Sequence, residues 1–128
     1  MTNLQDKKRV LVVEDEVRMM QMLGEELGGS GLEVLQATSG EEALRIARES
    51  EPDLVLLDIM LPGIDGMDVL KKMRESDWGK KIPVILLTNL SANEKIMGGV
   101  MRDEPSYYLI KADSSIGSIL EKVKEILN

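Results

Sequence analysis

Cysteine and histidine are both absent from the 128 residues of this sequence. The lack of cysteine excludes a disulfide scaffold, a thiolate nucleophile and a cysteine-ligated zinc ion. The lack of histidine removes imidazole as a general base or a metal ligand. Whatever chemistry the chain performs therefore uses oxygen and amine groups.

The sequence has fewer basic than acidic residues, and it has no long apolar run. The 16 Lys and Arg residues are outnumbered by 23 Asp and Glu residues, which gives a formal net charge of −7. Nucleic acid or an anionic membrane surface would repel such a chain on average, so we expect no direct nucleic-acid binding. No apolar stretch approaches the ~20 residues that cross a bilayer, and the opening MTNLQDKKRV has no apolar signal segment. We therefore expect a cytoplasmic protein without membrane contact.

Short unbroken apolar runs alternate along the chain with longer segments in which apolar residues recur every three or four positions. A length of 128 residues with 43% hydrophobic composition suits one domain with a buried core. The predicted strands are residues 10–13, 32–37, 54–57, 84–87 and 108–110. The predicted helices are residues 16–28, 39–50, 66–76, 91–102 and 114–127.

Continuous hydrophobicity in a short strand indicates that both of its faces are covered, as in a parallel sheet between two helix layers. The second run is interrupted by Glu33 and Gln36, which suits an edge strand. The sequence therefore predicts an α/β fold: a flavodoxin-like (βα)5 doubly wound parallel sheet with strand order 2-1-3-4-5.

Several residues mark where the predicted helices begin and end. The Ser-x-x-Glu patterns at 39–42 and 91–94 predict capping boxes, and Asp113 or Ser114 can cap the last helix. Trp78 falls in the loop before the fourth strand, and we assign it no function.

Polar side chains stand where the predicted strands end. Glu14 and Asp15 end the first strand and Asp58 ends the third, while Thr88 and Lys111 end the fourth and fifth. In an open parallel sheet, ligands bind beyond the carboxyl ends of the strands, at the point where the strand order reverses. We therefore expect all five groups to lie at one edge of the sheet.

Each of these groups has an ordinary structural explanation on its own. Asp15 could be a helix N-cap, Thr88 a strand-end hydroxyl and Lys111 a solvated side chain. Together, however, the carboxylates of Glu14, Asp15 and Asp58 would repel one another across neighbouring strands. A hard divalent cation would offset this repulsion, and oxygen ligands with room for water describe Mg²⁺ sites.

This constellation resembles the receiver domain of two-component response regulators over essentially the whole chain. The resemblance rests on Glu14-Asp15, on LLDIMLPGIDG around Asp58, on VILLTN with Thr88 and on YYLIK ending at Lys111. It implies a single receiver domain over residues 1–128 with no output domain and no enzymatic activity of its own. It would act in a two-component system or as an intermediate carrier in a phosphorelay. Its partners would be a sensor histidine kinase or histidine phosphotransfer protein and an unidentified downstream protein.

The resemblance also implies roles for the residues at the sheet edge. Asp58 would be the phosphoacceptor, attacking a partner's phosphohistidine or a small phosphodonor. Asp15, the Asp58 carboxylate and the backbone carbonyl of Met60 would bind Mg²⁺, with Glu14 reaching it through water. Thr88 and Lys111 would hold phosphoryl oxygens.

In the family, phosphorylation draws the strand-four hydroxyl inward and an aromatic side chain of strand five follows; here these residues are Thr88 and Tyr108. Helix four, strand five and helix five form the family's usual output face. The adjacent Gly98 and Gly99 weaken the predicted helix 91–102. That helix is then either a mobile element that phosphorylation reorders or one that ends early.

Three positions depart from the family pattern or bear on its rates. Ala112 follows Lys111 where receivers usually carry a cis proline, and a cis bond before a non-proline residue costs ~2.5–4 kcal/mol. We therefore predict a trans Lys111–Ala112 bond. Met60 and Leu90 stand where the family tunes attack by water, and both are apolar, so we predict slow hydrolysis of the phosphate.

The first predicted helix is unusually rich in methionine. Some of its apolar residues must face the sheet, and the rest could form the docking surface for a kinase's helical domain: Val17, Met19, Met20, Met22 and Leu23.

Other functions remain as alternatives. The chain could be a pseudo-receiver that binds proteins without phosphorylation, or a receiver fragment of a longer DNA-binding response regulator. A haloacid-dehalogenase-type phosphatase would need a second Asp where the chain has Met60, and a flavodoxin would need a phosphate-binding loop in place of residues 14–16. The sequence therefore matches neither this type of phosphatase nor a flavodoxin.

Overall fold

A computed structural model of the chain describes residues 7–88, 107–110 and 115–128, with Thr88, Tyr107, Tyr108 and Ile110 described by their backbone alone. The predicted helix at 91–102 and its capping pattern lie outside these residues. The elements are β1 (Arg9–Val13), α1 (Val17–Gly29), β2 (Glu33–Ala37), α2 (Gly40–Ser50), β3 (Leu54–Asp58), α3 (Gly66–Glu75), β4 (Val84–Thr88), β5 (Tyr107–Ile110) and α5 (Ile116–Leu127).

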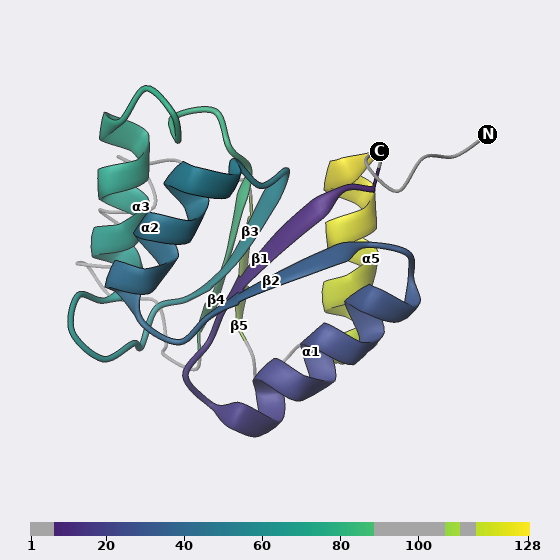
Figure 1. Cartoon of the computed structure of the whole chain (residues 1–128). Coiled ribbons are helices and arrows are strands. Elements are labelled where there is room, and N and C mark those ends of the chain that lie inside the picture. Colours follow the sequence, from purple (N-terminus) through teal and green to yellow (C-terminus); the bar gives the residue numbers. More distant parts are fainter. Residues whose placement is uncertain (1–6, 89–106, 111–114) are drawn as a thin grey trace.

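The five strands form one parallel sheet in the order β2-β1-β3-β4-β5, so the predicted fold class and strand order are confirmed. Figure 1 shows α1 and α5 on one face of this sheet and α2 and α3 on the other. The order reverses between β1 and β3, where the chain has crossed from one side of β1 to the other. The crevice expected in such a sheet therefore opens beyond the ends of β1 and β3.

Alternate residues of the central strands feed two separate cores, because successive side chains of a strand point to opposite faces. One core, with α2 and α3, contains Leu11, Val13, Val55 and Leu57. The other, with α1 and α5, contains Val10, Val12, Leu54 and Leu56. Since both faces are covered, the strand residues are continuously apolar, as the sequence indicated.

The helix starts differ in detail from the prediction. Capping of the last helix by Asp113 or Ser114 was wrong: the N-cap is Ser115, whose hydroxyl accepts the Ser118 N–H at 3.1 Å. A serine at this position reaches the free N–H of the first turn, whereas a residue further back does not.

The capping box predicted at 39–42 is only partly formed. The Ser39 hydroxyl accepts the Glu42 N–H at 3.2 Å, but the Glu42 carboxylate accepts the N–H of Thr38 at 2.8 Å rather than that of Ser39. A complete box opens α3 instead, between Asp65 and Asp68. It was missed because aspartate replaces the usual Glu or Gln at the third helical position.

Across the part of the chain that the structure describes, no helix combines the length and the apolar character needed to cross a bilayer.

Candidate metal site

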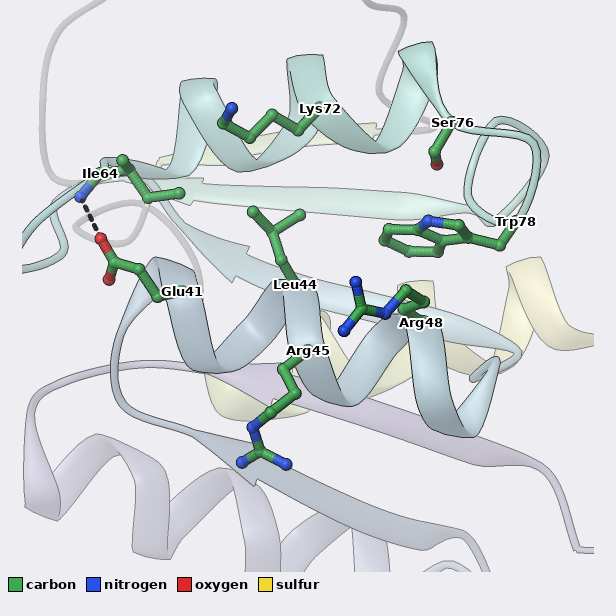
Figure 2. Close-up of a pocket in the computed structure, with 8 residues that line it drawn as sticks. All are labelled: Glu41, Leu44, Arg45, Arg48, Ile64, Lys72, Ser76 and Trp78. Atoms are coloured by element: carbon green, nitrogen blue, oxygen red, sulfur yellow. Dashed lines mark hydrogen bonds between the residues drawn. The ribbon is translucent and has the colours of Figure 1, made fainter.

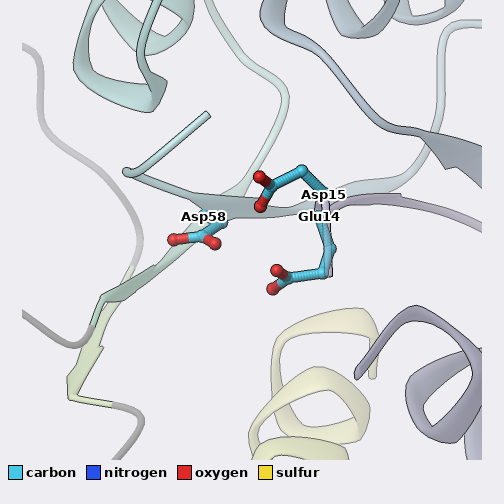
Figure 3. Close-up of side chains that lie close together, drawn as sticks. All are labelled: Glu14, Asp15 and Asp58. Carbon is cyan, nitrogen blue, oxygen red and sulfur yellow. The ribbon is translucent and has the colours of Figure 1, made fainter. Parts of the chain in front are cut away.

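Three carboxylates meet where β1 and β3 end, and one oxygen of each lies within 4.8 Å of the others. The sheet register explains this: Val13 and Leu57 are paired, so Glu14 and Asp58 each stand one residue beyond the same pair. Figure 3 shows Glu14 and Asp15 at the end of β1 close to Asp58 at the end of β3. The structure therefore brings together the three acidic residues that the sequence placed at this edge.

Two of these carboxylates are buried. Glu14 is 2% exposed and Asp58 5% exposed, and among the described residues they are the only buried charged side chains. Asp15 is exposed and faces solvent at the rim. Burial of like charges at this separation is unfavourable unless an opposite charge or hydrogen bonds compensate for it.

Backbone N–H groups fix the two buried carboxylates. Oε1 of Glu14 accepts the Glu16 N–H at 3.1 Å, and Oδ1 of Asp58 accepts the Met60 N–H at 3.1 Å. Each bond joins residues two apart, so it forms as the chain turns out of the strand. These bonds orient the two carboxylates at the strand ends.

The loop after Asp58 is held by close contacts on both sides. Gly66, the first residue of α3, lies so near the strand end that a Cβ atom there would collide with the carbonyl oxygen of Asp58 and the Cα atom of Ile59. Gly63 has a φ of +75°, a conformation that favours glycine, and the Glu41 carboxylate of α2 accepts the Ile64 N–H at 3.2 Å. The sequence marked the turn, but it did not reveal this contact with α2.

The other predicted site residues are described in part or not at all. Thr88 ends β4 as predicted, and its backbone pairs with Ile110; Tyr108 pairs with Leu86, two residues earlier on β4. Lys111, Leu90 and Ala112 lie outside the described residues, so the trans Lys111–Ala112 bond stays a prediction. The Met60 side chain is 56% exposed, and its carbonyl remains a predicted metal ligand.

The donor set suits a hard cation. Three carboxylates supply only oxygen ligands, and the exposed position of Asp15 leaves the rim open to water. Mg²⁺ and Ca²⁺ prefer such ligands, whereas softer metals favour nitrogen or sulfur. The pocket can therefore hold a divalent metal ion.

The chain resembles known proteins in both sequence and structure. The family model described as "Response regulator receiver domain" matches residues 10–124. The chain is 39% identical over 92 residues to the alkaline phosphatase synthesis transcriptional regulatory protein PhoP of Bacillus subtilis, covering 71% of this chain and 38% of PhoP. It is 41% identical over 81 residues to the polar-differentiation response regulator DivK of Brucella anthropi, covering 63% of this chain and 66% of DivK.

Solved structures agree with these sequence matches. A CheY-like response regulator receiver domain protein from Methanospirillum hungatei superposes with a TM-score of 0.86 at 26% identity, covering 95% of this chain and 94% of the other. A putative response regulator from Chloroflexus aurantiacus gives a TM-score of 0.84 at 32% identity, covering 95% and 98%.

Proposed function

The chain belongs to the response regulator receiver domain family, and from this premise we propose that Asp58 accepts a phosphoryl group in a Mg²⁺-dependent reaction. Receiver domains of this family interact with histidine kinases and with downstream effectors. The observation that carries the proposal is the convergence of carboxylate oxygens from Glu14, Asp15 and Asp58 within 4.8 Å. A pseudo-receiver would have no need for two buried carboxylates side by side.

The chemistry assigned to Asp58 is in-line displacement at phosphorus. An oxygen of the Asp58 carboxylate forms a new P–O bond while the P–N bond of a phosphohistidine breaks, and the electron pair leaves with the imidazole nitrogen. The product is an acyl phosphate on Asp58. The Met60 N–H fixes the carboxylate at 3.1 Å before attack, which suits a reaction that depends mainly on alignment.

The remaining residues of the site neutralise and bind the incoming group. When bound, Mg²⁺ would offset the negative charge shared by the carboxylates and the phosphoryl oxygens. Asp15, Asp58 and the Met60 carbonyl would hold it directly, with Glu14 acting through water. Thr88 follows the position on β4 that pairs with Asp58, which supports its assignment, with Lys111, to the phosphoryl oxygens.

Phosphorylation would be read out at the family's usual output face, of which the structure describes β5 and α5. An aspartyl phosphate adds charge and acceptor oxygens near Thr88. Tyr108 would respond as the switch residue, and its register position two residues from Thr88 on the neighbouring strand supports that role. The slow hydrolysis predicted from Met60 and Leu90 would keep this face switched for long enough to bind a downstream protein.

Helix α1 is the proposed docking surface for the phosphodonor protein. Met20 and Leu23 are buried against the sheet, whereas Val17 is 74% exposed and Met22 42% exposed. Exposed apolar side chains on a helix beside an acidic site suit the helical domain of a sensor histidine kinase or a histidine phosphotransfer protein.

We further propose that the chain acts in the cytoplasm as a receiver that signals through protein contacts and catalyses no reaction on another substrate. The 38% coverage of PhoP supports the alternative, in which the chain is the receiver of a longer DNA-binding regulator.

Incubation with acetyl phosphate and Mg²⁺, followed by intact-mass measurement, tests the proposal. The parent chain should gain one phosphoryl group, and Asp58→Ala should gain none. Asp77→Ala, which removes an exposed carboxylate remote from the site, is the matched control and should label like the parent. A phosphoryl group gained by Asp58→Ala would overturn the site assignment, and no gain by the parent would favour the pseudo-receiver.

A further inference from the structure

A groove of about 480 Å³ lies between α2 and α3, on the opposite face of the sheet from α1 and α5. Its apolar lining consists of Leu44 from α2, Ile64 from the loop before α3 and Trp78 from the loop after α3 (Figure 2). All three are partly buried and pack on the core beneath α2 and α3. The apolar lining is therefore held in place by the fold.

The groove runs along α2. Its lining there extends from Glu41 to Arg48, and the seven steps between these residues, at 1.5 Å each, span roughly 10 Å. Ile64 stands near one end, beside Glu41, and Trp78 lies towards the other, near the level of Arg48 (Figure 2). A ligand in this groove would lie along two turns of α2, with one side open to solvent.

Three cations and one carboxylate, that of Glu41, line this apolar surface on a chain whose formal net charge is −7. The cations are Arg45 and Arg48 of α2 and Lys72 of α3, all exposed. Arg45 has one exposed ion pair, with Glu49 at 3.5 Å, which is weak enough to rearrange. Within the described part of the chain, Arg48 and Lys72 have no ion pair.

The shape and the charge together favour a peptide over a small molecule. Small-molecule sites usually enclose most of the ligand, which an open groove along two helix turns does not do. A peptide can lie along such a groove, placing one or two apolar side chains on Leu44 and Trp78. Its carboxylates would meet Arg45, Arg48 and Lys72, and this complementarity would steer its approach to an otherwise acidic molecule.

We infer that the α2–α3 groove is a docking site for an acidic segment of a partner protein, one that carries a large apolar side chain between Asp or Glu residues. This surface is separate from α1 and from the face containing β5 and α5. The inference does not depend on phosphorylation of Asp58, so a failure of either proposal leaves the other standing.

Selection from a library of short random peptides tests this inference, with the full chain as bait. Acidic peptides with an apolar residue should be enriched. An enriched peptide without tryptophan, made synthetically, should change the fluorescence of Trp78, which is the single tryptophan of the chain and so reports on the groove alone.

Two matched triple variants decide whether the groove is the site. Arg45→Glu, Arg48→Glu and Lys72→Glu combined should raise the peptide's Kd by on the order of tenfold or more. Lys7→Glu, Lys8→Glu and Lys71→Glu combined make the same change in net charge at exposed lysines that do not line the groove, and should leave the Kd nearly unchanged. Circular dichroism checks that both variants fold.

Three results would contradict a docking site for acidic peptides in this groove. Enrichment of peptides without acidic character, equal Kd values for the two triple variants, or an unchanged Trp78 signal would overturn the inference. Titration with ATP covers the rival ligand class. The groove would be a nucleotide site instead if ATP quenched Trp78 fluorescence saturably, if the groove variant lost this quenching, and if the library yielded no acidic peptide.

Discussion

At the scale of single residues, the carboxylate of Asp58 is buried close to two other carboxylates. Asp58 is 5% exposed, and one of its carboxylate oxygens lies within 4.8 Å of an oxygen of Glu14 and an oxygen of Asp15. A core position would ordinarily hold an apolar residue here, as Leu54 to Leu57 do in the same strand. Repulsion among the three carboxylates would oppose folding, whereas a divalent metal ion bound between them would offset it.

Replacing Asp58 by Asn should therefore stabilise the chain when divalent ions are removed by a chelator. The amide oxygen can still accept the Met60 N–H, while one of the clustered negative charges is lost. The free energy of unfolding, measured by urea denaturation, should rise by about 1–2 kcal/mol. Mg²⁺ should stabilise the parent more than the variant. Asp77→Asn, on the surface, should change little, and a less stable Asp58→Asn would contradict this account of the site.

At the scale of elements, the site depends on how closely α3 approaches the end of β3. The Gly66 N–H donates to the Ile59 carbonyl at 2.8 Å, and the Asp65–Asp68 capping box fixes where the helix begins. The position of Gly66 leaves no room for a Cβ atom beside the Asp58 carbonyl. The helix start and the strand end therefore form one rigid junction, with Asp58 at its centre.

Gly66→Ala should break this junction. The added methyl group meets backbone atoms that cannot move aside as a side chain would, so we expect a loss of about 2–3 kcal/mol in the free energy of unfolding. Gly28→Ala is the matched control: its added Cβ meets nothing within 4 Å, and it should be neutral or stabilising by up to ~1 kcal/mol. Equal effects of the two substitutions in urea denaturation would show that the close approach is unimportant.

At the scale of the whole molecule, the sequence predicted what depends on strand pattern and missed what depends on packing between distant elements. Unbroken apolar runs indicated a sheet covered on both faces, and the acidic residues after two of these runs indicated where the site lies. The contact of Glu41 with Ile64 was not predictable, because it joins two segments 23 residues apart. Trp78 was assigned no function for the same reason, since the groove exists only once α2 and α3 lie side by side.

The proposed function requires that the acidic cluster bind Mg²⁺, which calorimetric titration of the metal-free chain with Mg²⁺ measures. We expect saturable binding of one ion per chain, strongly weakened in Asp58→Asn and unchanged in Asp77→Asn. No saturable binding by the parent, or binding that Asp58→Asn leaves intact, would contradict it.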